Sequence, residues 1–109
     1  MDRIIAKAER LKNPTIACLG LAYKPDIDDL RESPAVEIVE ELRGRNVGEL
    51  KIVEPNLDDH DSFELTSLND AIDSADIVVI LVGHKPFLSL PTSKLAEKII
   101  IDTCGITNR

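Results

Sequence analysis

Four short apolar runs are spaced along the chain, and they constrain its fold more than any other feature. They are TIACLGLA at 15–22, ELKIVEP at 49–55, DIVVILVG at 76–83 and IIIDTCG at 99–105. Their apolar residues follow one another without alternating with polar ones, which is typical of strands buried on both faces of a parallel sheet. The sequence therefore predicts four strands covered on both sides.

Helical patterns fill the segments between these runs. Ser33 supplies an N-cap and Pro34 a first helical residue for one helix, and further helices are predicted at 2–12, 66–75 and 92–97. Strands that alternate with helices are typical of the α/β class. We expect a three-layer, Rossmann-like doubly wound parallel sheet of about four strands, preceded by a short N-terminal helix. Right-handed connections make 2-1-3-4 its simplest strand order.

A ligand site in such a sheet lies at the carboxyl ends of the strands, where the strand order reverses. Here that point falls between the first and third strands. The segments expected at this site are therefore 20–34 and 83–87, with 54–56 and 102–105 beside them.

Length and charge narrow the function classes. The chain has 109 residues, which favours one domain, and its formal net charge of -7 disfavours nonspecific binding to nucleic acid or to anionic membranes. No apolar run approaches the roughly 18–20 residues that span a bilayer. The N-terminal segment lacks the apolar block of a signal peptide, so we expect a cytoplasmic protein without membrane contact.

The segment GLAYKPDIDDLRESP at 20–34 does not match the glycine-rich phosphate loops. It lacks G-x-G-x-x-G, and Glu54, the acid that ends the second strand, lies 34 residues after Gly20 rather than about 20. The Walker pattern is also missing. Cys18 and Cys104 form no metal-ligand pattern, and the DDHD stretch at 58–61 is interpreted as a solvated loop, so no metal or cofactor site is predicted in this chain.

The same segment carries two cations, Lys24 and Arg31, that have two possible roles. Acidic residues surround them at Asp26, Asp28, Asp29 and Glu32. One interpretation is an ion-paired loop that caps the following helix. The other is an anion site, because an aromatic residue beside a cation, as in Tyr23-Lys24, suits a nucleotide and its phosphate. His84, at the end of the third strand, is likewise either a structural residue or a ligand contact.

Several motifs together resemble a known family. Gly20, Tyr23-Lys24, Asp29, Arg31 and Ser33 match a pattern of glycine, aromatic-lysine pair, acidic stretch and D-x-R-x-S. VEP, LVGHKPF and IIIDTCG match its later strand ends. The chain thus resembles, over nearly its whole length, the C-terminal UDP-binding domain of the UDP-glucose/GDP-mannose dehydrogenase family, especially its UDP-N-acetylmannosamine dehydrogenase branch.

The resemblance implies a role within a larger enzyme of polysaccharide biosynthesis. Intact members join an NAD-binding Rossmann domain, a central helix at a dimer interface and this domain. They oxidise the C6 hydroxyl of a sugar nucleotide to a carboxylate in two NAD-dependent steps through a cysteine-bound intermediate. The catalytic cysteine and the NAD fingerprint precede the region matched here, so the chain alone is predicted to be inactive. Residues 1–13 would be the end of the central helix and 14–109 the UDP-binding domain.

The resemblance also implies residue roles. Tyr23 and Lys24 would contact the UDP-sugar, and we add Arg31 and His84 to the predicted substrate-binding residues. Gly20, Asp29 and Ser33 would build the segment. The family often has a basic residue after the last-strand aspartate, whereas Cys104 and Gly105 follow here.

Two alternatives remain open at this stage. The domain could be a structural or oligomerisation module with no ligand of its own. It could also be an autonomous nucleotide-binding or CoA-binding domain of another α/β family.

Overall fold

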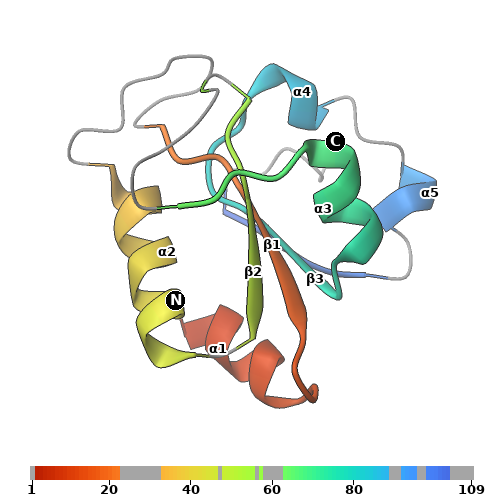
Figure 1. Cartoon of the computed structure of the whole chain (residues 1–109). Coiled ribbons are helices and arrows are strands. Elements are labelled where there is room, and N and C mark those ends of the chain that lie inside the picture. Colours follow the sequence, from red (N-terminus) through yellow and green to blue (C-terminus); the bar gives the residue numbers. More distant parts are fainter. Residues whose placement is uncertain are drawn as a thin grey trace.

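Four parallel strands form one sheet in the order β2-β1-β3-β4 in the computed structural model (Figure 1). The structure describes residues 2–22, 33–46, 48–55, 57, 63–88, 92–95 and 98–103. The strands are β1 (Thr15–Leu19), β2 (Glu49–Val53), β3 (Ile77–Ile80) and β4 (Ile99–Asp102). This architecture confirms the predicted doubly wound parallel sheet and its strand order.

Helices connect the strands and cover both faces of the sheet. They are α1 (Asp2–Glu9), α2 (Pro34–Arg45), α3 (Leu68–Ser74), α4 (Lys85–Leu88) and α5 (Thr92–Leu95). α1 and α3 are shorter than the helices predicted at 2–12 and 66–75, and α5 lies within the helix predicted at 92–97. α4 occupies residues for which no helix was predicted. No helix in the described ranges is long and apolar enough to cross a membrane.

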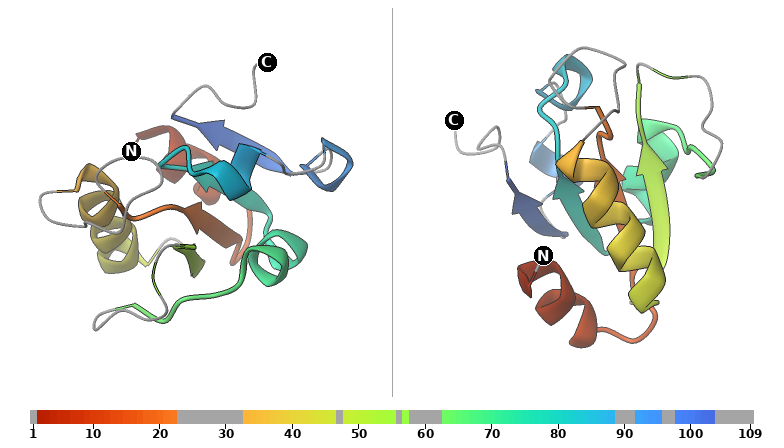
Figure 2. Two further views of the ribbon diagram at one scale, coloured as in Figure 1. Left: turned by 90° about the horizontal axis from the view of Figure 1, so that it is seen from above. Right: turned by 90° about the vertical axis from the view of Figure 1, so that its left-hand side faces the viewer.

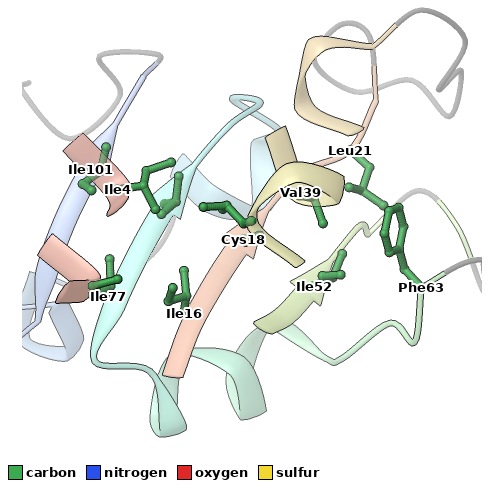
Figure 3. Close-up of a cluster of buried hydrophobic side chains, with 12 residues drawn as sticks. Ile4, Ile16, Cys18, Leu21, Val39, Ile52, Phe63, Ile77 and Ile101 are labelled. Atoms are coloured by element: carbon green, nitrogen blue, oxygen red, sulfur yellow. The ribbon is translucent and has the colours of Figure 1, made fainter. Parts of the chain in front are cut away.

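Alternate residues of each strand point into two separate cores. Ile16 and Cys18 of β1 pack on one face with α1, α2 and Phe63, whereas Ala17 and Leu19 pack on the other with α3 and Phe87. Figure 3 shows the first core, in which Ile4 of α1 lies near Ile101 and Ile77. The N-terminal helix is thus part of the same folded body as the sheet. Figure 2 shows α2 and α3 on opposite sides of the strands.

α2 ends at Arg45, between Gly44 and Gly48. Asn46 is the C-cap in the left-handed conformation, with φ of 51°. Its side chain suits this conformation better than most residues do. Gly44 lies inside α2, and Gly48 has a packing role, because a Cβ there would collide with the carbonyl of Pro14.

Candidate functional site

The carboxyl ends of β2, β1 and β3 lie side by side where the strand order reverses. Leu19 pairs with Val53 on one side and with Ile80 on the other. Residues that directly follow these three strands therefore meet at the edge where doubly wound sheets bind ligands. The chain turns out of the sheet there, before α2 and before α4 (Figure 1).

Gly20 is the first residue after β1, and its backbone needs glycine. Its φ is +98°, a region that L side chains rarely adopt, and a Cβ would lie 2.7 Å from the Cβ of Val82. Its N–H donates to the carbonyl of Val53 at 2.8 Å. The chain thus leaves the sheet in close contact with the exit of β3.

Glu54 directly follows β2 and is buried, with the whole residue 3% exposed and its side chain fully buried. Its Oε1 accepts the backbone N–H of Leu21 at 2.9 Å and that of Ala22 at 3.0 Å. The same oxygen lies 2.8 Å from Nε2 of His84. One carboxylate oxygen therefore joins the exits of β2, β1 and β3.

His84 lies between β3 and α4 and is fully buried. Because a carboxylate oxygen only accepts hydrogen bonds, its contact with Glu54 assigns the ring hydrogen to Nε2. The ring also meets Phe87 edge to face, with 5.5 Å between their centroids. The structure thus gives His84 an internal partner, and its contact with a substrate stays a prediction.

Ser33 is the N-cap residue of α2 and Pro34 follows it, as predicted, but the side chain of Ser33 does not cap the helix. Its side chain makes no cap hydrogen bond and is buried. Instead, its Oγ donates to the carbonyl of Leu21 at 2.7 Å and reaches that of Ala22 at 3.4 Å. The hydroxyl therefore bonds to the exit of β1. Ala22 and Ser33, the described residues on either side of 23–32, are both held there by hydrogen bonds.

The remaining predicted site residues lie outside the described residues. They are Tyr23, Lys24, Asp29 and Arg31. All four belong to the segment between the two anchored residues, Ala22 and Ser33.

The turn after β1 does not fit a dinucleotide. In a dinucleotide-binding turn the backbone N–H groups point at the pyrophosphate. Here the N–H groups of Leu21 and Ala22 donate to Glu54, and that of Gly20 donates to Val53. These observations agree with the missing glycine fingerprint: the N–H groups of residues 20–22 are already engaged within the protein and are not offered to a pyrophosphate.

Neither metal chemistry nor cysteine chemistry arises from the described part of the site. Within the described ranges no group of three or more His, Cys, Asp or Glu side chains could hold a metal ion. Cys18 lies in the core of β1, where burial raises its pKa to about 12. A thiol with so high a pKa is a poor nucleophile at neutral pH.

A cavity of about 280 Å³ adjoins the same edge of the sheet. It is lined by Val53, Glu54, Pro55, Leu57, Leu65, Thr66, Ser67 and Leu68. Glu54 thus contributes both to the anchor of the β1 exit and to the wall of this cavity.

Sequence reasoning examined Glu54 only as a possible ribose ligand and missed its internal role. A usable signal was present: in the order 2-1-3, an acid directly after the second strand and a histidine after the third lie on either side of the end of the first strand. What could not be seen was that the carboxylate turns inward, because its donors come from residues 30 or more positions away.

The sheet, with Ala22 and Ser33 anchored at its switch point, defines a doubly wound α/β domain. The chain belongs to the UDP-glucose/GDP-mannose dehydrogenase family, whose UDP binding domain matches residues 17–109. This match confirms the resemblance drawn from the motifs.

Individual relatives agree with this assignment. An NDP-N-acetyl-D-galactosaminuronic acid dehydrogenase of Ralstonia solanacearum is 43% identical over 97% of this chain and 26% of its own length. A UDP-N-acetyl-D-mannosamine dehydrogenase of Campylobacter jejuni is 43% identical over 89% of the chain and 26% of its own length. The solved UDP-N-acetyl-mannosamine dehydrogenase of Staphylococcus aureus superposes with a TM-score of 0.81 at 30% identity, over 96% of this chain and 25% of its own. The chain thus spans about a quarter of the length of these relatives.

Proposed function

We propose that the chain is the UDP-sugar-binding domain of an NAD-dependent UDP-sugar 6-dehydrogenase that oxidises the C6 hydroxyl of UDP-N-acetylmannosamine to a carboxylate. The family membership supports the UDP-binding part of this proposal. The name of the Campylobacter jejuni relative supports the choice of sugar. The same proposal includes residues 1–13 as the end of an inter-domain helix, a cytoplasmic location and a homo-oligomeric whole protein, which the resemblance implies is a dimer.

The observation that carries the proposal is the anchoring of both ends of one segment at the switch point. Ala22 is tied to Glu54, and Ser33 is tied to the carbonyl of Leu21. The ten residues between these anchors include Tyr23 and Lys24. In the proposal, Lys24 donates to a phosphate oxygen and Tyr23 packs against the nucleotide.

The other predicted contacts complete this assignment. Arg31 binds or orients an anion with its planar donors, and Asp29 helps to build the segment. His84 supports the site from the β3 side, where it bonds with Glu54. A substrate contact of His84 itself remains part of the proposal.

The domain contributes binding rather than chemistry. UDP would bind here, far from the C6 atom that reacts. Its binding energy would position the sugar and so lower the barrier to the oxidation at C6. NAD supplies the hydride acceptor when it binds elsewhere in the whole enzyme. Since Cys18 is buried and its pKa is raised to about 12, this chain offers no reactive thiol among its described residues and is proposed to be inactive alone.

Calorimetric titration of the chain with UDP tests the binding proposal. We expect saturable binding that Lys24→Ala weakens at least tenfold. The control is Lys51→Ala, which removes a half-buried lysine paired with Glu49 in β2 and should leave the affinity unchanged. Absence of saturable binding, or equal affinities for the chain and Lys24→Ala, contradicts the proposal. A loss of stability or dimerisation with unchanged affinity would favour the structural module instead.

Competition between sugar nucleotides tests the choice of sugar. UDP-N-acetylmannosamine should displace UDP more effectively than UDP-glucose does. Equal displacement by UDP-N-acetylmannosamine and UDP-glucose would show that this chain recognises only the UDP group. The sugar would then be selected by other parts of the whole protein.

A further inference from the structure

Three donors from the exits of two strands converge on one oxygen of Glu54, which directly follows a third strand, β2. The donors are the backbone N–H groups of Leu21 and Ala22 after β1 and the ring N–H of His84 after β3. We propose that Glu54 is a positioning residue: its carboxylate sets the backbone direction of the segment that carries Tyr23 and Lys24, without contacting the ligand itself. The ligand side of this inference rests on the proposed function, whereas the backbone side does not.

The Leu21–Ala22 unit is held from two directions. Glu54 accepts both of its N–H groups, at 2.9 and 3.0 Å. Ser33 donates to its carbonyl groups, at 2.7 Å for Leu21 and 3.4 Å for Ala22. Hydrogen bonds on both sides of consecutive peptide groups restrict their rotation. Because Tyr23 follows Ala22 directly, the orientation of this unit sets where Tyr23 and Lys24 begin.

Burial makes this arrangement difficult for solvent to replace. Glu54 is 3% exposed, Ser33 is 2% exposed and His84 is fully buried. A buried N–H that loses its acceptor finds no water in its place, so the anchoring depends on the carboxylate. His84 holds that carboxylate in turn, because His84 is itself fixed in position. Its backbone N–H donates to the carbonyl of Val82, and its ring packs against Phe87.

The charge of Glu54 would otherwise oppose an anionic ligand. A carboxylate facing a phosphate is repulsive, yet Oε1 receives hydrogen bonds from Leu21, Ala22 and His84. These donors direct that oxygen toward the protein interior. The residue type therefore suits a backbone anchor behind the site better than a direct contact with UDP.

Two variants of the chain test the inference. Glu54→Gln keeps the shape of the side chain but replaces the carboxylate with a weaker neutral acceptor. Val78→Ala is the control, because Val78 is fully buried in β3 in the other core and its loss lowers stability without touching the anchor. Amide hydrogen exchange of Leu21 and Ala22 reports the anchor, and titration with UDP reports its consequence.

We expect Glu54→Gln to speed exchange at Leu21 and Ala22 at least tenfold relative to Cys18 in β1, and to weaken UDP binding at least tenfold while the chain stays folded. Val78→Ala should do neither. Where Glu54→Gln does not fold, Ser33→Ala replaces it, since it releases the same unit from the carbonyl side.

Unchanged exchange at Leu21 and Ala22 would overturn the anchor, whatever the UDP result. Faster exchange with unchanged UDP affinity, or an equal loss of affinity in Val78→Ala, would overturn the positioning role. If the unsubstituted chain binds no UDP, the proposed function fails, and so does the positioning role of Glu54 for that ligand. The exchange rates of Leu21 and Ala22 still decide whether Glu54 anchors the backbone.

Discussion

The two edges of the sheet each hold a carboxylate that accepts a backbone N–H from the β1 region, and they differ in burial. At the amino-terminal edge, Asp76 accepts the N–H of Thr15 at 2.9 Å and is exposed. At the carboxyl-terminal edge, Glu54 accepts two N–H groups and is buried. Water can replace Asp76 as the acceptor of its N–H group, because that site is exposed, but it cannot reach the buried N–H groups that Glu54 accepts. The same chemistry is therefore a minor local contact at one edge and a structural requirement at the other.

The connections at the two edges also differ, in their length. At the amino-terminal edge, a turn from Ala75 leads directly into β3, and Lys98 donates to the carbonyl of Ala75 at 2.7 Å. At the carboxyl-terminal edge, a long segment leaves at Ala22 and returns at Ser33. The edge that carries the candidate site is thus the edge where buried polar groups do the anchoring.

Removing the buried carboxylate should have the largest effect. Glu54→Ala leaves two buried N–H groups and His84 without this acceptor, and we expect the free energy of unfolding to fall by about 3–5 kcal/mol. Urea denaturation followed by circular dichroism measures it. A loss below about 1 kcal/mol would remove the distinction between the two edges.

Gly20→Ala should come next. The added Cβ would lie 2.7 Å from the Cβ of Val82 at a φ of +98°, so backbone strain and overpacking together should cost about 2–4 kcal/mol. Gly44→Ala is the matched control, because nothing lies within 4 Å of its added Cβ in α2. It should instead stabilise the chain by about 0.5–1 kcal/mol. Equal thermal midpoints for the two variants would show that the exit of β1 tolerates a side chain.

Ser33→Ala should cost about 1–2 kcal/mol, because the buried carbonyl of Leu21 loses its donor. Ser74→Ala provides the comparison. Its hydroxyl also donates to a carbonyl, that of Asp70, but it does so at the surface of α3. Chemical denaturation should therefore separate the two serines, with almost no change for Ser74→Ala. Similar losses in both variants would mean that burial does not decide the value of the bond.

Asp76→Ala should have the smallest effect, below about 1 kcal/mol, because solvent satisfies the N–H of Thr15 once the carboxylate is gone. The thermal midpoint of unfolding checks it. A loss as large as that of Glu54→Ala would show that the amino-terminal edge also depends on its carboxylate.

Much of the fold was predictable from the residues. Continuous apolar runs indicated strands buried on both faces, and right-handed connections gave the observed order. The strand ends were placed too far along the chain, since Gly20 turns out of the sheet at a positive φ after Leu19. The four-residue helix α4 was missed because a pattern that short has no periodicity to detect.

The candidate site was only partly predictable. The motif placed Tyr23 and Lys24 in the segment after β1, and the strand order placed that segment at the switch point. The sequence could also nominate Ser33 as a capping residue. It could not show that its hydroxyl would donate to Leu21 instead, because that choice depends on how closely α2 approaches the exit of β1.

The class of fold, the family and the edge of the sheet that holds the candidate site can all be inferred from the residues alone. These depend on local periodicity and on motifs of consecutive residues. The contact between Glu54 and His84 in the interior, where Glu54 also anchors Leu21 and Ala22, becomes visible only in the folded chain. The physical reason is that burial and hydrogen-bond partners are set by residues far apart in the chain, which become neighbours only when β2, β1 and β3 pair.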